Sequence, residues 1–392
     1  MRNTRAKNMK TTKGGVKLLV VILIILILVA GGLLAVKFWQ DSQNQKQVGN
    51  TNTVEEQEEI PEPITFAGNE RPIAFMIDNN INAMPQAGLL EADLVYEIIV
   101  EGGETRLMLV MQGKDLDKIG PLRSARHYFL DYALENDAIY VHYGQSPQAK
   151  EDIESLSISD INGIYESESL FWRDSSRYAP HNAVTSTANI EKIIEREGFR
   201  TTTHQDPVLN YVVEQELDSI EEIEQQEQQE KAENQQQSSN VSENNNQEEE
   251  TQTTSQIQEA WEVTIPYSVY NTVKYEYDPE TQTYIRYSRD KKQVDWETEK
   301  EVTTKNIIIT FIENESIDSY GRQTLYNIKK ADGYYITNGK AIPITCEKTS
   351  RSGKTIYKDL NGNELKVNDG KTFIQICPIN SEVEFKGETV EE

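Results

Sequence analysis

The stretch LVYEIIVEGGETRLMLVM, residues 94–111, decides the fold of the first half of the chain. It contains two apolar runs, 94–100 and 107–111, which are short enough to form buried strands. The glycine pair Gly102-Gly103 lies between them and permits a tight turn. The stretch therefore predicts two interior strands with charged residues at their junction.

Neighbouring segments extend this prediction. The apolar runs 72–77 and 139–141 predict further strands, and the residue spacing over 124–134 predicts a helix with one apolar face. A later helix is expected to begin near Ser186 and to end at Gly198. Strands mixed with helices predict an α/β domain. The two helical faces contain Ala125, Phe129 and Ala133 in the first helix and Ile190, Ile193 and Ile194 in the second.

The second half of the chain predicts a different architecture. Short strand-like runs alternate with turn residues such as those at 278–281, and no long helical period interrupts them. We therefore expect a mostly antiparallel β domain, which makes the overall fold class α+β. The predicted strands are 261–268, 273–277, 283–287, 306–312, 333–337, 341–347 and 372–377.

The N-terminus has the pattern of a membrane anchor. Residues 18–36 contain no charged or strongly polar side chain, and as a helix they would span roughly 28 Å, close to the thickness of a bilayer core. Phe38 and Trp39 suit the headgroup level, and the six basic residues before the apolar run place 1–17 in the cytoplasm. The sequence predicts a single-pass protein of the cell membrane, with most of its chain outside the cytoplasm.

Two other anchoring modes fit the same region less well. A cleaved signal peptide usually has an apolar region of only about 7–15 residues. A lipid anchor requires a cysteine just past the apolar run, and the first cysteine of this chain is Cys346. An uncleaved helix over 18–39 is therefore the expected membrane contact.

The charge of the chain is concentrated in one tract. The 392 residues have a formal net charge of −26, and residues 214–259 contribute −13 of it through 14 acidic residues and one lysine. Such an acidic balance argues against nucleic acid as a partner. The tract is typical of a solvated linker, with a cation-binding or partner-binding tail as the alternative.

These features divide the chain into seven segments. The predicted ranges are a cytoplasmic basic tail (1–17), a transmembrane anchor (18–39), a stalk (40–64), an N-terminal α/β domain (65–213), an acidic linker (214–259), a C-terminal β-rich domain (260–380) and an acidic tail (381–392).

Arginines provide the strongest candidate for a binding site. Arg106 follows the glycine pair, and Arg123 and Arg126 lie three residues apart where the predicted helix 124–134 would begin. A helix N-terminus with several arginines is a suitable cradle for a phosphate or carboxylate. The alternative is that these arginines form structural ion pairs. The acidic residues available for such pairs are Glu97, Glu101, Glu104 and Asp131.

A second polar group precedes the later helix and contains Arg173, His181 and Asn182. His181 could act as a proton donor or acceptor near neutral pH, and a hydrogen bond that holds its own loop is the more common use of such a residue. Asp78 closes the first strand and could orient an arginine, hold a cation or cap a loop. His181 and Asp78 are thus the candidate catalytic residues, with a weaker case for His142.

Other chemistry has little support in the sequence. Neither Ser124 nor Ser146 lies in a nucleophile elbow, and no His-x-x-x-His spacing is present. We therefore predict no metal site and no cofactor. Cys346 and Cys377 both lie in predicted strands, where they are either buried thiols or a disulfide.

Several motifs of the chain occur in one order. They are Arg71-Pro72-Ile73-Ala74, Pro85-Gln86-Ala87-Gly88, Ala92-Asp93-Leu94-Val95-Tyr96-Glu97, Glu101-Gly102-Gly103, Gly120-Pro121-Leu122-Arg123-Ser124-Ala125-Arg126, Ser146-Pro147-Gln148-Ala149, Pro180-His181-Asn182 and, more loosely, Asp318 with Gly321-Arg322. Together they resemble the YerB-like bacterial lipoprotein family. The resemblance covers about 66–213 and 261–378, and it implies an N-terminal and a C-terminal domain, a bacterial envelope location and no established activity. The chain departs from the family in its missing lipid-anchor cysteine, in Cys346 and Phe373 where tryptophans are expected, and in its long acidic insert.

The leading hypothesis is an envelope binding or scaffold protein with an anionic-ligand site in its N-terminal domain. A phosphate-bearing wall polymer or a lipid headgroup would be a natural ligand at that location. One alternative is a cell-wall polymer phosphotransferase or hydrolase, and another is a structural module that binds an envelope protein partner. The candidate ligand-binding residues are Arg106, Arg123, Arg126, Arg173, His181 and Asn182.

Overall fold

The stretch 94–111 forms two strands, as predicted, and the structure shows that they are antiparallel neighbours. In the computed structural model, which describes residues 62–214 and 257–388, β2 (Leu94–Ile99) pairs with β3 (Thr105–Met111) across the 3-10 helix η2 (Glu101–Gly103). Gly102 and Gly103 both have positive φ, which explains the glycine pair at this turn. The two predicted strands are confirmed.

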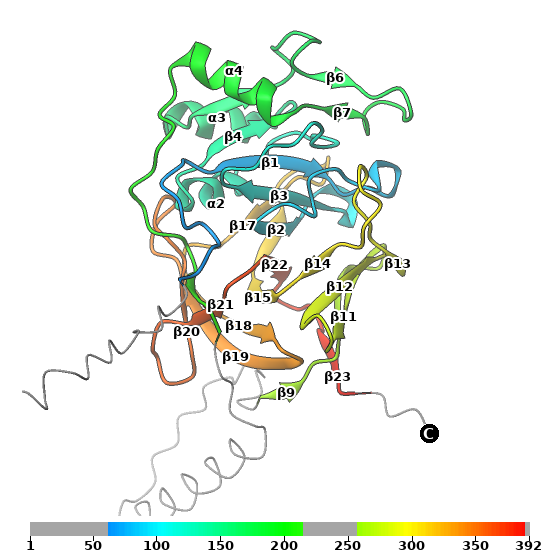
Figure 1. Cartoon of the computed structure of the whole chain (residues 1–392), viewed down its shortest axis with the longest axis vertical. Helices are drawn as coiled ribbons and strands as arrows, with labels where there is room; N and C mark the ends of the chain where they lie inside the picture. Colours follow the sequence, from blue (N-terminus) through cyan, green and yellow to red (C-terminus); the bar gives the residue numbers. More distant parts are fainter. Residues whose placement is uncertain (1–61, 215–256, 389–392) are drawn as a thin grey trace, which may run out of the picture. The chain divides into compact units, whose positions relative to one another are not determined.

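Strands from both halves of the chain join in one large sheet (Figure 1). β22 from the second half lies between β2 and β15 and is parallel to both. The order of the sheet is β20-β19-β18-β15-β22-β2-β3-β1-β4-β5, and β9 also pairs with β19. The remaining bounds are β1 (Ile73–Asp78), β4 (Ile139–His142), β5 (Asp160–Asn162), β9 (Gln258–Glu259), β15 (Asn306–Ile312), β18 (Lys330–Thr337), β19 (Lys340–Glu347), β20 (Ile356–Lys358) and β22 (Thr372–Pro378).

A second sheet has the order β13-β12-β11-β10-β23, with β14 paired to β12. β23 lies in the range predicted as an acidic tail, and β9 lies at the end of the range predicted as a linker. The bounds are β10 (Glu262–Ser268), β11 (Asn271–Asp278), β12 (Thr283–Ser288), β13 (Lys291–Lys292), β14 (Thr303–Thr304) and β23 (Glu384–Lys386). Three short pairs complete the strands: β6 (Trp172–Arg173) with β7 (Ala183–Val184), β8 (Asn210–Val212) with β21 (Lys366–Asn368), and β16 (Asn314–Ser316) with β17 (Gln323–Leu325).

The two faces of the large sheet are covered differently. Alternate residues along β1 face opposite sides, so Ala74 and Met76 pack with α2 (Phe129–Glu135) and α3 (Pro147–Ser155). Phe75 and Ile77 pack in the cluster that contains the second sheet and α4 (Thr187–Glu197). The result is a mixed α/β fold dominated by strands, in which helices cover one face and mainly a sheet covers the other.

The helix predicted over 124–134 is wrong in its first turn. α2 begins only at Phe129; a turn at His127 and Tyr128 precedes it, and Leu122 and Ala125 form isolated β-bridges to other segments. The backbone N–H groups of Leu122, Arg123 and Ala125 donate to the carbonyls of Ala183, Met76 and Gly144, at 2.6, 2.8 and 2.9 Å. These distant partners use N–H groups that a helix beginning at Ser124 would have left free, so the predicted helix start beside Arg123 is wrong.

The later helix is confirmed. α4 is capped by the side chain of Ser186 and ends at Gly198, which has a φ of 67°. The buried residues on its inner face include all three predicted isoleucines. The predicted anchor over 18–39 lies outside the described residues, and no helix within the described ranges is long and apolar enough to cross a membrane.

Both cysteines are buried free thiols. Burial raises the pKa of Cys346 to about 12 and also raises the pKa of Cys377. The sequence left open whether the two cysteines are buried thiols or a disulfide. In the structure they are buried thiols, which pack in the core as small apolar groups.

Candidate functional site

The three predicted arginines converge on one pocket. Arg106 lies on β3 opposite Asp78 at the end of β1, and Arg123 and Arg126 lie on the segment that leads to α2. Together they line a pocket of about 320 Å³, here called the arginine pocket. Its lining residues are Asp78, Asn80, Val100, Glu101, Glu104, Thr105, Arg106, Arg123, Ser124, Arg126, Gln145, Ser146, Tyr320 and Arg322.

One carboxylate serves two of these arginines. Glu101 accepts hydrogen bonds from Nε and Nη2 of Arg126 at 2.6 and 3.0 Å, and it lies 3.7 Å from Nη2 of Arg106. Arg106 also donates to the carbonyl of Ser124, and Arg126 donates to the carbonyl of Ala125 at 2.8 Å. Two guanidinium groups therefore share a single counter-charge on the pocket wall.

The electrostatics of Arg106 reflect this shortage of negative charge. Burial, and then the nearby charge of Arg126, lower the pKa of Arg106 to about 10. The attraction of Glu101 acts in the opposite direction and is not sufficient to restore the usual value. An added anion in the pocket would stabilise the charged form of Arg106.

Asp78 connects the arginine pocket to the loop before β7. Its Oδ2 atom accepts a hydrogen bond from Nδ1 of His181 at 2.8 Å and lies 3.2 Å from Nε of Arg123. Its Oδ1 atom accepts the backbone N–H of Asn80 at 3.0 Å. Asp78 therefore orients a histidine, pairs with an arginine and caps a loop at the same time. The two candidate catalytic residues are in direct contact.

The other residues of that loop have local roles. Arg173 donates to Oδ1 of Asn182 at 3.0 Å and stacks over Tyr143 at 4.7 Å. Asn182 in turn donates to the carbonyls of Asp174 and Arg177, both at 3.0 Å. Neither Arg173 nor Asn182 lines the arginine pocket, so of this predicted group only His181 is bonded to one of its residues.

His142 has a structural position. Its side chain is fully buried at the end of β4, with Nδ1 at 2.8 Å from the carbonyl of Gly144 and Nε2 at 3.1 Å from Asp160 on β5. These contacts hold β4 to β5 and to the Gly144 loop, and neither His142 nor Asp160 lines the arginine pocket.

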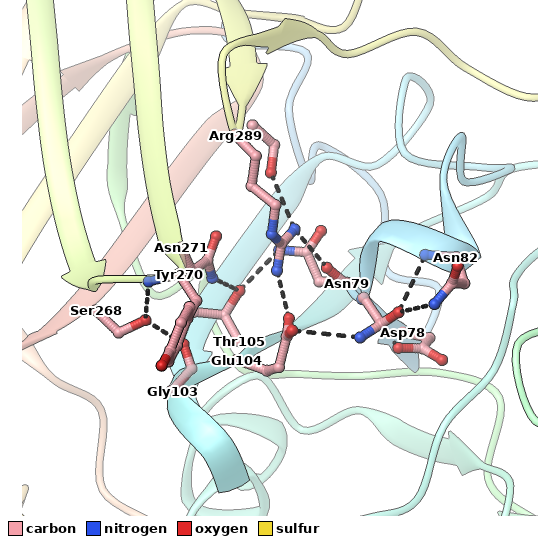
Figure 2. Close-up of polar contacts among 12 residues, drawn as sticks. Asp78, Asn79, Asn82, Gly103, Glu104, Thr105, Ser268, Tyr270, Asn271 and Arg289 are labelled. Carbon is pink, nitrogen blue, oxygen red and sulfur yellow. Dashed lines mark hydrogen bonds and ion pairs between the residues drawn. The ribbon is translucent and has the colours of Figure 1, made fainter.

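The remaining acidic residues proposed as structural partners pair with other cations. Glu97 binds Arg286, and Asp131 binds Arg351. Glu104 binds Arg289, which also donates to the carbonyl of Asn79 at 3.0 Å (Figure 2). Figure 2 shows Glu104 held between Arg289 and the loop that follows Asp78. Of the four acidic residues that could have neutralised the three arginines, Glu101 therefore is the one that pairs with them.

Ten of the fourteen pocket residues were not predicted as site residues, and two of these ten come from a distant part of the chain. Tyr320 and Arg322 come from the loop between β16 and β17, some 200 positions after Arg123 in the chain. In the sequence, the motif Asp318 with Gly321-Arg322 points to this loop, but it contributes only to the family resemblance and indicates no role in a site. Within the described ranges, no group of three or more His, Cys, Asp or Glu residues is placed to hold a metal ion.

Comparison with known proteins gives the relatives of this chain. Residues 62–200 match the N-terminal domain, and residues 263–374 the C-terminal domain, of the family described as "Protein of unknown function (DUF3048)". The chain is 30% identical to "Putative lipoprotein YerB" of Bacillus subtilis over 319 residues, which are 79% of this chain and 81% of that protein.

The chain belongs to the YerB-like family. Its fold is similar to the crystal structure of the YerB protein from Bacillus subtilis, with a TM-score of 0.65 and 28% identity over 81% of this chain and 94% of the other. In this YerB-like protein the arginine pocket takes Asp78 and the three arginines from the first matched domain and Tyr320 and Arg322 from the second.

Proposed function

We propose that this protein is a membrane-anchored, extracytoplasmic binding protein whose arginine pocket holds a phosphate-bearing ligand. The observation that carries the proposal is the shared carboxylate, since among the described residues Arg106 and Arg126 both form their ion pair with Glu101. Planar guanidinium groups form paired hydrogen bonds with phosphate oxygens, and a partly desolvated site strengthens each bond.

The position of Arg123 adds to this support. Its side chain is 27% exposed, and its paired carboxylate, Asp78, is divided between it and His181. A phosphate group in the pocket could therefore bind Arg123 without breaking a fully buried ion pair. The three arginines would then surround the ligand from two neighbouring backbone segments.

The proposed location rests on the relatives and on the N-terminal sequence. A relative named as a lipoprotein supports a place at the outer side of a membrane. The apolar run 18–36 would provide the tether in this chain, as a single-pass helix with 1–17 in the cytoplasm. Wall polymers and lipid headgroups are the phosphate-bearing molecules at such a location.

Calorimetric titration of the full-length protein in detergent with pyrophosphate tests the binding. We expect Arg123→Ala and Arg126→Ala each to weaken affinity by about tenfold or more, because each removes a charge-assisted contact. Arg351→Ala is the matched control, since its side chain is 30% exposed and also pairs with aspartates, outside the arginine pocket.

The opposite result identifies a purely structural role. If pyrophosphate does not bind, or if the arginine variants lower only the free energy of unfolding, the arginines are structural ion pairs. The protein would then be better described as an interaction module for an envelope protein partner.

The contact between Asp78 and His181 favours a second candidate function, a phosphotransferase or hydrolase of wall polymers. Because the carboxylate accepts from Nδ1, the other ring nitrogen, Nε2, can take a proton from an attacking hydroxyl or water. The arginines would stabilise the charge that develops on the transferred phosphoryl group.

Turnover of a polyprenyl pyrophosphate substrate separates this function from binding alone. An enzyme should convert the substrate to polyprenyl phosphate, with the other phosphoryl group passed to an acceptor hydroxyl or to water. It should lose most of this turnover in His181→Ala, with pyrophosphate affinity changed by less than threefold. A wild-type protein that binds pyrophosphate and never turns the substrate over would contradict the second candidate and leave the first intact.

A further inference from the structure

The loop between β16 and β17 is built around one carboxylate. Asp318 accepts the backbone N–H groups of Tyr320 and Arg322 at 3.0 and 3.1 Å, and its second oxygen accepts from Nη1 of Arg322 at 2.6 Å. Gly321 has a φ of 80°, a conformation that suits glycine. This explains the motif Asp318 with Gly321-Arg322, because each residue is needed for the same tight loop.

The loop presents an aromatic ring at the arginine pocket. Tyr320 is 77% exposed, yet it lines the pocket together with Arg322. The guanidinium of Arg322 lies 5.0 Å from the centre of the Tyr320 ring and so covers one of its faces. A large aromatic side chain is thus held in place at the pocket while much of its surface is left in water.

The rest of the pocket is suited to hydroxyl groups. Apart from Tyr320, Val100 is the sole apolar residue among those lining it, and the neutral polar residues include Asn80, Ser124 and Gln145. Beyond Tyr320 and Val100, this lining offers a flat base no further apolar side chain. A sugar ring instead combines one face of C–H groups, which packs on a tyrosine, with hydroxyls that bond to polar side chains.

We propose that the ligand of the arginine pocket is a phosphorylated sugar, whose phosphate binds Arg106, Arg123 and Arg126 and whose ring packs on Tyr320. This inference rests on the proposed function, since it assumes a phosphate in the pocket. It assigns the C-terminal matched domain a specific task, which is to recognise the group attached to that phosphate.

Titration of the full-length protein with two phosphomonoesters of equal charge tests the inference. We expect N-acetylglucosamine 1-phosphate to bind about tenfold more tightly than glycerol 3-phosphate, and Tyr320→Ala to remove this preference without weakening glycerol 3-phosphate by more than twofold. Tyr320→Phe should keep the preference, because packing does not need the hydroxyl. Tyr165→Ala is the matched control, with 78% exposure outside the arginine pocket.

The outcomes distinguish this inference from the proposed function. Equal affinity for both esters, or tighter binding of a nucleoside monophosphate, overturns the sugar assignment while a phosphate site remains. No binding of either ester or of pyrophosphate overturns both. Binding to vesicles that carry the same sugar phosphate on a lipid, compared with binding to a soluble wall-polymer fragment, separates the two sources of the ligand. If the protein prefers either one and Tyr320→Ala removes that preference, the result supports a phosphorylated sugar.

Discussion

Glu97 on β2 and Arg106 on β3 each belong to an Arg–Glu cluster, and the two clusters differ in how well their charge is balanced. Arg286 and Glu97 form a one-to-one pair at 2.5 Å with both side chains at 0% exposure. Glu97 also accepts from Asn79 and Thr105, at 3.0 and 2.7 Å. In the arginine pocket, by contrast, Arg106 and Arg126 share Glu101 at the edge of an open cavity.

The pKa values of the two buried arginines move in opposite directions. Burial alone would lower the pKa of Arg286, but the charge of Glu97 raises it above its usual value. Burial and Arg126 together lower the pKa of Arg106 to about 10. The comparison teaches that a buried arginine with its own carboxylate keeps its charge, whereas crowded arginines that share one carboxylate carry unbalanced positive charge, which is the basis of the proposed anion site.

The largest expected effect comes from breaking the balanced pair. Arg286→Met leaves the buried charge of Glu97 without its partner, so the free energy of unfolding should fall by about 3–5 kcal/mol. Urea unfolding followed by circular dichroism measures the loss. Adding Glu97→Gln should recover part of it, because the unpaired charge is then removed.

Ligand affinity provides the control for that experiment. Pyrophosphate binding by the folded fraction of Arg286→Met should stay within about twofold of the wild type, because Arg286 does not line the arginine pocket. A destabilisation below about 1 kcal/mol would mean that the two clusters do not differ as described.

A smaller effect of opposite sign is expected from Glu101→Gln. This change removes the negative charge that competes with the ligand for Arg106 and Arg126, so pyrophosphate should bind several-fold more tightly. Calorimetry measures the affinity, and thermal unfolding measures the accompanying loss of stability. Weaker binding would show instead that Glu101 is required to position the arginines.

The smallest effect concerns pH. Because Arg106 has a pKa of about 10, it loses its charge as the pH rises through that value, and phosphate affinity should fall severalfold between about pH 9 and pH 11. Phosphate itself stays a dianion over most of this range. Titrations at intermediate pH values trace the decrease, and an Arg106→Gln variant should show a flatter profile. An equally steep profile in that variant would assign the decrease to another group.

Much of the fold could be predicted from local patterns. The strand at 306–312 and the helix ending at Gly198 were predicted with nearly their observed bounds, since their apolar spacing and capping residues are local features. The segment before Phe129 was not, because its N–H groups bond to residues as distant as Ala183. No local spacing reveals such partners.

The candidate site shows the same division. The arginines were predicted from a helix start expected beside Arg123 and Arg126 and from the glycine pair before Arg106; they do line one pocket, although that helix start is wrong. Both candidate catalytic residues were named separately. Their mutual contact joins residues 103 positions apart, and the contribution of Tyr320 comes from a different matched domain. Only the three-dimensional structure brings these side chains to one pocket.

A crystal structure of the protein soaked with tungstate tests the central claim most directly. Tungstate has the tetrahedral shape and charge of phosphate, and its anomalous scattering locates it without ambiguity. The account predicts a strong peak in the arginine pocket, within hydrogen-bonding distance of Arg106, Arg123 or Arg126. An empty arginine pocket at a tungstate concentration that fills other surface sites would contradict it.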